Sequence, residues 1–478
     1  MLNKKDNTVL NNALNIFKNT SKNVEAYKKF LKQKKVSSQE IIKKKDFESI
    51  PIMDKKNYLL AFKPLELVPF SKFPPMFSAS SGSSGKPYYW PRGTKQEERG
   101  ARIHRTILKD IFKIGNKKTL VIICFSMGNW VAGTYTLTSL REIANDKNTN
   151  LSIITPGIDK NDVIQTLKNF AGNFEKVIMF GYPPFLMDVV CEAKEINLNL
   201  KKFNIDFVFA GENFSEKWRE LILKYAGISK KEKNRSISVY GTADAGAIGH
   251  ENPFTILIRK LMIKNLEFKK ELLGNVSFLP TIVSYDPMDT YFEVIDNELI
   301  FTTDSGIPLV RYNIKDYGIL LSNVHVLSLI KKHGLSKYVT NDIKKWVNPL
   351  IVLRGRSDVS TTFYGLNIYP ENIKTGLESD KIFHLITGKY TIKTEEVNDY
   401  REQKLKIEIE LRPKVLTTEE INKIITDEIV KSFKELNTEY RKLFNSINEK
   451  AIPEIVLIEH GDERFIIKKA KHKWIQNK

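Results

Sequence analysis

The chain of 478 residues contains only two cysteines, Cys124 and Cys191, which lie far apart in the sequence. This pair excludes a disulfide framework and a cysteine-based zinc site. The seven histidines form no HxH or HxxxH pair, so they give no metal-binding motif either. No apolar run approaches the roughly 20 residues that a membrane-spanning helix needs, and the N-terminus has no apolar core of a secretory signal. We therefore expect a cytoplasmic protein without a membrane span.

Positive charge is in excess. The formal net charge is +20, and residues 1–50 alone hold 12 lysines against five acidic residues. A surplus of this size can serve an anionic partner such as nucleic acid, an anionic membrane surface or an acidic protein. It also accompanies many Asn and Ile residues, a composition that AT-rich codons produce by themselves. The sequence contains no RNP-like motif of aromatic and basic residues and no helix-turn-helix signal, so nucleic acid is the less favoured partner.

Strand and helix patterns alternate between residues 119 and 240. The clearest segments are Thr119–Phe125, Asp162–Phe170, Val177–Phe180, Pro184–Ile196, Asp206–Ala210, Ser215–Ala226 and Ile237–Tyr240. Such alternation predicts an α/β domain with a largely parallel sheet. After about residue 280 the pattern changes to alternating strands. We expect a large N-terminal α/β domain over residues 1–355, helical over 1–50, and a small mobile α+β C-terminal lid domain over 356–478.

A loop rich in glycine and serine precedes the α/β region. It reads Ser80, Ser81, Gly82, Ser83, Ser84, Gly85 and Lys86, followed by Pro87. Small residues allow backbone N–H groups to converge on a phosphate, hydroxyls add donors, and a lysine supplies a positive charge. The spacing is not that of a Walker A loop. A flexible linker has the same composition, so the loop by itself leaves both interpretations open.

The loop resembles the phosphate loop of the acyl-adenylate-forming enzymes, whose usual form is SGTTGKP. Further segments resemble landmarks of the phenylacetate–CoA ligase branch, in the same order along the chain. These segments are Phe180–Pro184, Phe209–Glu212, Val239–Gly246, Pro308–Tyr312 with Asp316, Leu353–Asp358 and Gly365–Pro370. The resemblance extends from about residue 50 to the C-terminus, and it implies the adenylate-forming fold with ATP and Mg²⁺ as cofactors.

The resemblance also implies roles for individual residues. The nucleotide would be held by the loop Ser80–Lys86, by Gly211 and Glu212 beside adenine, by Tyr240 stacked on the base with Gly241 next to it, and by Asp316 and Arg356 at the ribose. Thr242 would donate to the α-phosphate and Asp244 would hold the magnesium ion. Lys469 would be the catalytic lysine, with Lys468 as the alternative register, and Asp358 would be the hinge of a rotating C-terminal domain. A solvated basic tail is the other interpretation of this lysine-rich end.

The segment after residue 125 is expected to select the substrate. Met127, Trp130 and Tyr135 would form apolar walls and Gly133 would make room, which fits an acyl or aryl carboxylate. Ordinary core packing explains these residues equally well.

Several positions depart from the family's usual pattern. Asp244 stands where the family has Glu, which shortens the magnesium-binding side chain by one methylene. Ile314 and Lys315 replace the usual Thr-Gly before Asp316. These changes indicate a divergent substrate or a weakened, non-catalytic relative.

The expected chemistry has two steps. ATP and a small-molecule carboxylate would give an acyl-adenylate, and a thiol would then attack it. The thiol would belong to coenzyme A or to the phosphopantetheine arm of an acidic acyl carrier protein, which would suit the basic large domain. Alternatives are transfer to an amine, which forms an amide, a nucleotide-binding protein without catalysis, and a nucleic-acid-binding protein.

Overall fold

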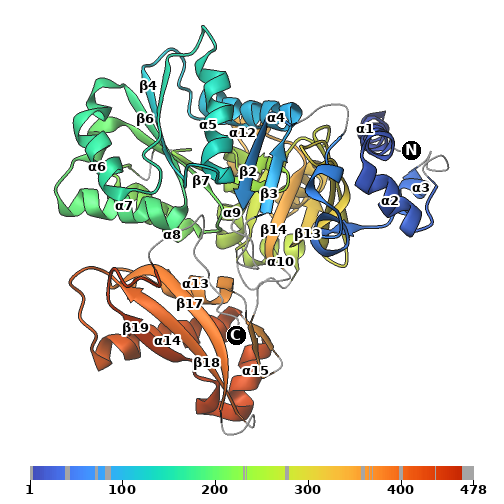
Figure 1. Ribbon diagram of the computed structural model, residues 1–478. Coiled ribbons are helices and arrows are strands. Elements are labelled where there is room, and N and C mark those ends of the chain that lie inside the picture. Colours follow the sequence, from blue (N-terminus) through green and yellow to red (C-terminus); the bar gives the residue numbers. More distant parts are fainter. Residues whose placement is uncertain are drawn as a thin grey trace.

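The structure is a computed structural model that describes residues 4–37, 44–69, 74–80, 88–229, 232, 234–274, 279–356, 361–364, 366–368, 370–397, 402–436 and 438–465. A large α/β part occupies the upper half of Figure 1, and a smaller α+β part built from the C-terminal residues lies below it. Within the described ranges, no helix combines the length and the apolar character needed to cross a membrane.

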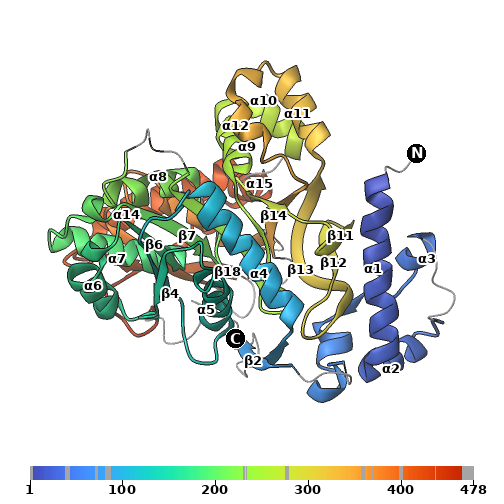
Figure 2. The same ribbon diagram turned by 90° about the horizontal axis from the view of Figure 1, so that it is seen from above.

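Five parallel strands form one half of the main sheet, in the order β5-β4-β6-β7-β8. They are β4 (Thr119–Cys124), β5 (Leu151–Ile154), β6 (Lys176–Gly181), β7 (Ile205–Ala210) and β8 (Ser236–Thr242). The connecting helices are α5 (Val131–Ala144), α6 (Lys160–Asn169), α7 (Pro183–Glu195) and α8 (Glu216–Tyr225). Helices α6 to α8 lie on the opposite side of β6 and β7 from α5 and from α4 (Thr94–Arg105) (Figures 1 and 2). This is the doubly wound arrangement that right-handed crossovers produce.

The other half of the sheet is largely antiparallel and continues in the order β9-β10-β14-β13-β12-β11. Its strands are β9 (Gly246–His250), β10 (Thr281–Tyr285), β11 (Thr290–Ile295), β12 (Glu298–Thr303), β13 (Leu309–Leu321) and β14 (Leu350–Arg356), with β1 (Met53–Asp54) paired to β13. The helices of this region are α9 (Pro253–Lys264), α10 (Leu266–Leu273), α11 (Asn323–Lys332) and α12 (Asn341–Lys344). The α/β class is confirmed. The whole sheet is mixed and not largely parallel, because β9 pairs antiparallel with β8 and strands β9 to β14 pair antiparallel with one another.

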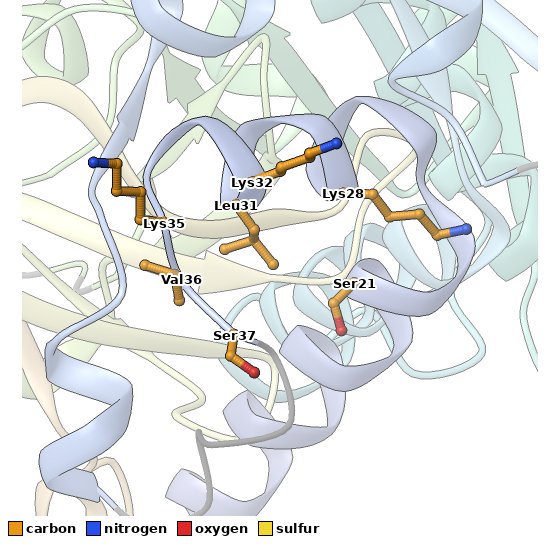
Figure 3. A pocket seen from close by; sticks show the side chains of 7 residues that line it. All are labelled: Ser21, Lys28, Leu31, Lys32, Lys35, Val36 and Ser37. Carbon is orange, nitrogen blue, oxygen red and sulfur yellow. The ribbon is translucent and has the colours of Figure 1, made fainter.

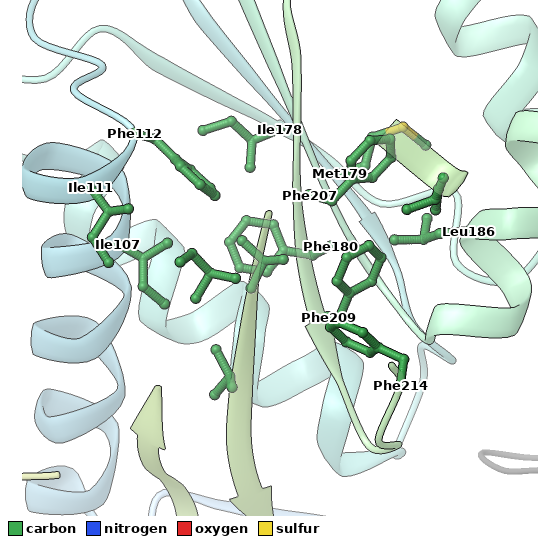
Figure 4. Packing of buried hydrophobic residues seen from close by; sticks show 14 of the residues in the cluster. Ile107, Ile111, Phe112, Ile178, Met179, Phe180, Leu186, Phe207, Phe209 and Phe214 are labelled. Atoms are coloured by element: carbon green, nitrogen blue, oxygen red, sulfur yellow. The ribbon is translucent and has the colours of Figure 1, made fainter. Parts of the chain in front are cut away.

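The core of the parallel half is dense and aromatic. Figure 4 shows side chains of β6 and β7, among them Phe180, Phe207 and Phe209, packed against residues of the segment 107–112. The rings of Phe207 and Phe209 are stacked with centroids 5.7 Å apart. Burial of one such side chain stabilises the fold by about 1.5–3 kcal/mol. A core of this kind fixes the strand ends, where the candidate site lies.

The N-terminal segment packs against the antiparallel half through helices α1 (Lys4–Asn23), α2 (Glu25–Gln33) and α3 (Lys44–Glu48) (Figure 2). Its buried face consists of aromatic side chains such as Phe17, Tyr27 and Phe30. Arg311 of β13 holds this segment against the sheet, because it pairs with Glu293 at 2.9 Å and donates to backbone carbonyls of residues 48 and 50. The helices expected over residues 1–50 are therefore part of the large α/β body.

The C-terminal part has its own three-stranded sheet, in the order β17-β18-β19. Its elements are β15 (Thr361–Phe363), β16 (Leu366–Ile368), α13 (Pro370–Leu377), β17 (Ile386–Val397), β18 (Glu402–Leu411), α14 (Glu419–Leu436), α15 (Thr438–Ile447) and β19 (Glu454–Ile458). They enclose a separate apolar cluster that draws no member from before residue 363. The boundary between 355 and 356, and the mobility of this part as a lid, stay predictions.

Candidate functional site

The carboxyl ends of the parallel strands meet at one edge of the sheet. Gly211 follows β7 directly, and Tyr240 to Thr242 end β8, which is the neighbour of β7. Gly211 has φ +92°, a backbone conformation that residues other than glycine rarely adopt. The chain therefore turns sharply there. In open α/β sheets, this edge is where ligands bind.

The aromatic end of β8 is linked to the antiparallel half by a hydrogen bond. The hydroxyl of Tyr240 donates to Oδ2 of Asp316 at 2.6 Å, although the two residues lie 76 positions apart. Asp316 is 8% exposed and stands opposite Arg356 in the register of β13 and β14. The structure therefore brings together Tyr240, Asp316 and the backbone of Arg356, three residues that the resemblance assigns to the nucleoside.

A second tyrosine–aspartate pair lies beside the first. Tyr312 donates its hydroxyl to Oδ2 of Asp244 at 2.5 Å. Burial, together with the negative charge of Asp244, raises the pKa of Tyr88 well above its usual value. Thr242 accepts the N–H of Ala245 at 3.0 Å, which fixes the turn between β8 and β9. Mg²⁺ in nucleotide sites is held by one or two carboxylates together with phosphate oxygens, so the single carboxylate of Asp244 fits this ion.

The departure before Asp316 has a structural consequence. Lys315 has φ +69°, in the left-handed region that glycine adopts without strain. Its N–H donates to Oδ1 of Asn313 at 2.8 Å, and its ammonium group pairs with Glu298 at 3.1 Å. The lysine therefore adopts a conformation that favours glycine, and two side chains hold it there.

Charged contacts join the C-terminal part to the large part. Lys374 of α13 pairs with Glu212 at 3.4 Å, so one of the residues expected beside adenine contacts the smaller part. Lys389 of β17 lies between Asp188 of α7 at 2.8 Å and Glu410 of β18 at 3.3 Å. Burial by itself lowers the pKa of Lys389, but these two carboxylates raise it above its usual value. The lysine is therefore charged at neutral pH and bridges the two parts.

The residues expected to line the acyl pocket follow β4. Tyr135 is buried and donates its hydroxyl to the carbonyl of Gln96 at 2.6 Å, whereas Met127 and Trp130 are partly exposed. At Gly133, a Cβ would lie 2.4 Å from the carbonyl oxygen of Ser126 and 2.7 Å from the sulfur of Met127. This close approach requires a glycine there, and its contribution to an acyl pocket stays a prediction.

Several expected site residues lie outside the described residues. They are Ser81, Gly82, Ser83, Ser84, Gly85, Lys86, Asp358, Lys468 and Lys469. Ser80 is described only as the last residue of β2 (Met76–Ser80), which pairs with β3 (Tyr88–Arg92). Strand β2 is fixed beside the acyl segment, because Ala79 donates its N–H to the carbonyl of Asn129 at 2.5 Å. The start of the loop therefore lies next to the expected acyl pocket.

Three contributors were not assigned a role from the sequence. Tyr312 belongs to a segment that resembles the family, so the sequence indicated that it lies near the site. Its hydrogen bond with Asp244 could not be predicted. Lys374 gave no signal, because a lysine on an amphipathic helix is usually solvated. Arg92 also gave none, although it is completely buried. Partners so distant in sequence leave no local pattern.

The lysine-rich N-terminal segment contains a surface hollow of about 520 Å³. Figure 3 shows Leu31 and Val36 in it, with Lys28, Lys32 and Lys35 at its rim and their ammonium groups directed away from one another. Diverging charges do not converge on one ligand atom. This hollow therefore accounts for part of the surplus charge without indicating a binding site.

No protein-family model and no curated protein matches the sequence. The chain superposes on 2-hydroxyisobutyryl-CoA ligase, in the postadenylation state with 2-HIB-AMP, with a TM-score of 0.68 at 14% identity, covering 98% of this chain and 89% of that chain. The same ligase in its thioesterification state, with 2-HIB-AMP and CoA, gives a TM-score of 0.55 at 14% identity, covering 99% and 89%. An acyl acid amido synthetase in complex with 2,4-DB gives 0.58 at 15% identity, covering 91% and 87%. The fold implied by the resemblance is confirmed.

Proposed function

We propose that the protein is a ligase that activates a carboxylic acid with ATP as an acyl-adenylate and then transfers the acyl group to a thiol. The observation that carries this proposal is the pair of tyrosine–aspartate contacts, Tyr240 with Asp316 and Tyr312 with Asp244, at the carboxyl edge of the sheet. They join the two halves of the sheet at the place where the resemblance puts the nucleotide, in a fold shared with a CoA ligase bound to an acyl-AMP.

Each residue has a defined task in this proposal. Asp316 accepts hydrogen bonds from the ribose hydroxyls, a task that suits an ionised carboxylate, and Tyr240 packs against the base. Thr242 donates to the α-phosphate. Asp244 holds Mg²⁺, which neutralises phosphate charge when bound. Lys469 completes the charge neutralisation at the reacting centre, so catalysis depends mainly on positioning and preorganised electrostatics.

We propose a thiol as the acceptor, either coenzyme A or the phosphopantetheine arm of a carrier protein in the cytoplasm. The likeness to a CoA ligase in complex with 2-HIB-AMP and CoA supports this choice. Transfer to an amine is the second candidate, supported by the likeness to an acyl acid amido synthetase. Single-turnover assays with a preformed acyl-adenylate and either coenzyme A or an amine distinguish the two acceptors.

Removal of the Asp316 carboxylate is expected to weaken ATP binding. Asp316→Ala deletes charge-assisted hydrogen bonds worth roughly 1.5–3 kcal/mol each, so ATP affinity should fall about tenfold or more. Isothermal titration with ATP measures the effect. The control is Asp304→Ala, which removes a partly exposed carboxylate paired with Lys95. Unchanged affinity in a folded Asp316→Ala protein would remove this residue from the nucleotide site.

Neutralising Lys389 is expected to separate the two parts of the chain. Lys389→Met leaves two mostly buried carboxylates, Asp188 and Glu410, without the cation between them, and loss of one buried partner costs about 2–5 kcal/mol. Small-angle scattering should show a larger radius of gyration. Lys393→Met is the matched control, because Lys393 lies on the same strand but pairs with Glu395 within the smaller part. Equal radii for the two variants would rule out a bridging role.

A further inference from the structure

Two polar side chains are completely buried near the acyl segment without hydrogen-bond partners. Arg92, the last residue of β3, is 0% exposed, and none of its three guanidinium nitrogens has a partner among the described residues. Gln96, in the first turn of α4, is also 0% exposed, and neither its amide oxygen nor its amide nitrogen has a partner in the same part of the chain. A buried charge is costly unless it is paired.

Helix α4 also contains Arg99, a buried arginine that has only a structural role. Arg99, 2% exposed, donates to the carbonyl of Ala247 at 3.1 Å, to that of Ala245 at 2.5 Å, and to the hydroxyl of Thr303 at 2.9 Å. Its hydrogen-bonding capacity is used within the protein. Arg92, at the end of β3, differs in this respect, so a structural role leaves its burial unexplained.

The surroundings of Arg92 and Gln96 place them at the expected acyl pocket. Burial lowers the pKa of Arg92 to about 10, so it remains a cation, and its neighbours Tyr135, Asp244 and Glu97 partly oppose that shift. Gln96 is adjacent to Tyr135 and to Gly246, because a Cβ on Gly246 would lie 2.8 Å from the Tyr135 hydroxyl and 3.0 Å from the Gln96 amide nitrogen. Both side chains therefore lie near Tyr135, a residue expected to line the pocket, and Arg92 also lies near Asp244.

A third unpartnered group belongs to this neighbourhood. The hydroxyl of Ser139 is buried without a partner among the described residues, and a Cβ on Gly100 would contact both it and the Tyr135 hydroxyl. An arginine, a carboxamide and a hydroxyl around one tyrosine form a donor-rich interior. An apolar acyl chain would leave all three unsatisfied, whereas carboxylate oxygens would accept from each of them.

We infer that Arg92 and Gln96 bind a second anionic group on the substrate, so that the protein activates a dicarboxylic acid rather than a simple fatty or aryl acid. This inference rests on the proposed function and narrows its substrate class. One carboxylate of the acid reacts at the nucleotide, near Thr242 and Asp244, while the other lies against Arg92. The apolar walls expected from Met127 and Trp130 then contact only the carbon chain between the two carboxylates.

Chain-matched acids test the inference. ATP–pyrophosphate exchange and, separately, direct titration without nucleotide are measured with succinate against butyrate, glutarate against valerate, and terephthalate against 4-methylbenzoate. In the pair of acids that reacts fastest, the wild-type protein should favour the diacid by about 100-fold or more in kcat/KM. The reason is that a site built to form hydrogen bonds with a ligand group rejects a ligand that lacks this group. Arg92→Met should abolish this preference and increase relative use of the monoacid. Arg102→Met removes an exposed arginine of α4 and should leave the preference for the diacid unchanged.

Each other outcome has a defined meaning. Equal use of both acids by the wild-type protein, or an equal loss for both in Arg92→Met, overturns the inference and leaves the proposed function standing. Direct binding of a diacid that Arg92→Met abolishes, without exchange for any acid, supports the site and contradicts the proposed function. If Arg92→Met does not fold, Gln96→Leu decides, since it should weaken diacid use about tenfold and spare the monoacid. An unchanged ratio in Gln96→Leu overturns the inference.

Discussion

Replacement of Lys469 by alanine is expected to slow adenylation by roughly 100- to 1,000-fold, while thiolysis of a supplied acyl-adenylate remains nearly unchanged. The reason is that one preorganised donor to the charge that develops in the transition state contributes about 2.7–4 kcal/mol. The resemblance implies that this lysine meets the α-phosphate and the carboxylate only in the adenylating orientation. Single-turnover rates, measured once from ATP and acid and once from preformed acyl-adenylate and thiol, separate the two half-reactions.

The neighbouring lysines provide matched controls for this prediction. Lys468→Ala, Lys471→Ala and Lys473→Ala change the same charge within the same stretch of sequence. A large loss in Lys468→Ala alone would keep the chemistry and shift the register by one residue. Small and similar effects for all four variants are what a solvated basic tail predicts, and they would refute the role given to this segment.

Replacement of Glu251 by glutamine is expected to lower the free energy of unfolding by about 3–5 kcal/mol, as for other buried ion pairs that lose one partner. Glu251 is 0% exposed and accepts hydrogen bonds from Arg219 at 2.7 Å, from Arg259 at 2.9 Å and from the N–H of Ser238 at 2.9 Å. Neutralisation leaves two buried guanidinium groups that still pair with Glu216 but have lost the second carboxylate they share. Because Ser238 lies in β8, the loss also loosens the strand that carries Tyr240.

Urea unfolding followed by circular dichroism measures this change. Glu142→Gln is the control, since Glu142 forms a solvent-exposed pair with Arg105 at 3.3 Å and should change stability by about 1 kcal/mol or less. A loss at Glu251 as small as the loss at Glu142 would show that the network is hydrated in solution, and the rigidity attributed to the end of β8 would then need another source.

The parallel half of the fold could be predicted because its strands leave a strong local pattern. Runs such as Thr119–Phe125 and Asp206–Ala210 are apolar on both faces and alternate with helices whose first turns are capped, for example by Ser215. The antiparallel half was predicted as strands but not as part of the same sheet. Strand periodicity states which residues face the core, but it contains no information about which distant strand is the partner.

The candidate site, too, could be predicted only in part. Asp316 and Tyr240 were assigned together only through the resemblance, since no periodicity relates residues 76 positions apart. The hydroxyl of Tyr312 on Asp244 and the burial of Arg92 depend on long-range packing and could not be predicted from the sequence. The close packing at Gly133 could not be predicted for a related reason. A glycine signals that space is needed, but only the structure shows that Met127 fills that space.

ATP–pyrophosphate exchange, measured over aryl, fatty, dicarboxylic and amino acids, tests the central claim most directly. The account predicts exchange that requires a carboxylic acid, that is strongest for one chemical class, and that falls sharply in Asp316→Ala. Absence of exchange with every acid, in a protein that binds ATP with an affinity dependent on Asp316, would contradict acyl-adenylate formation and leave a nucleotide-binding protein without this catalysis.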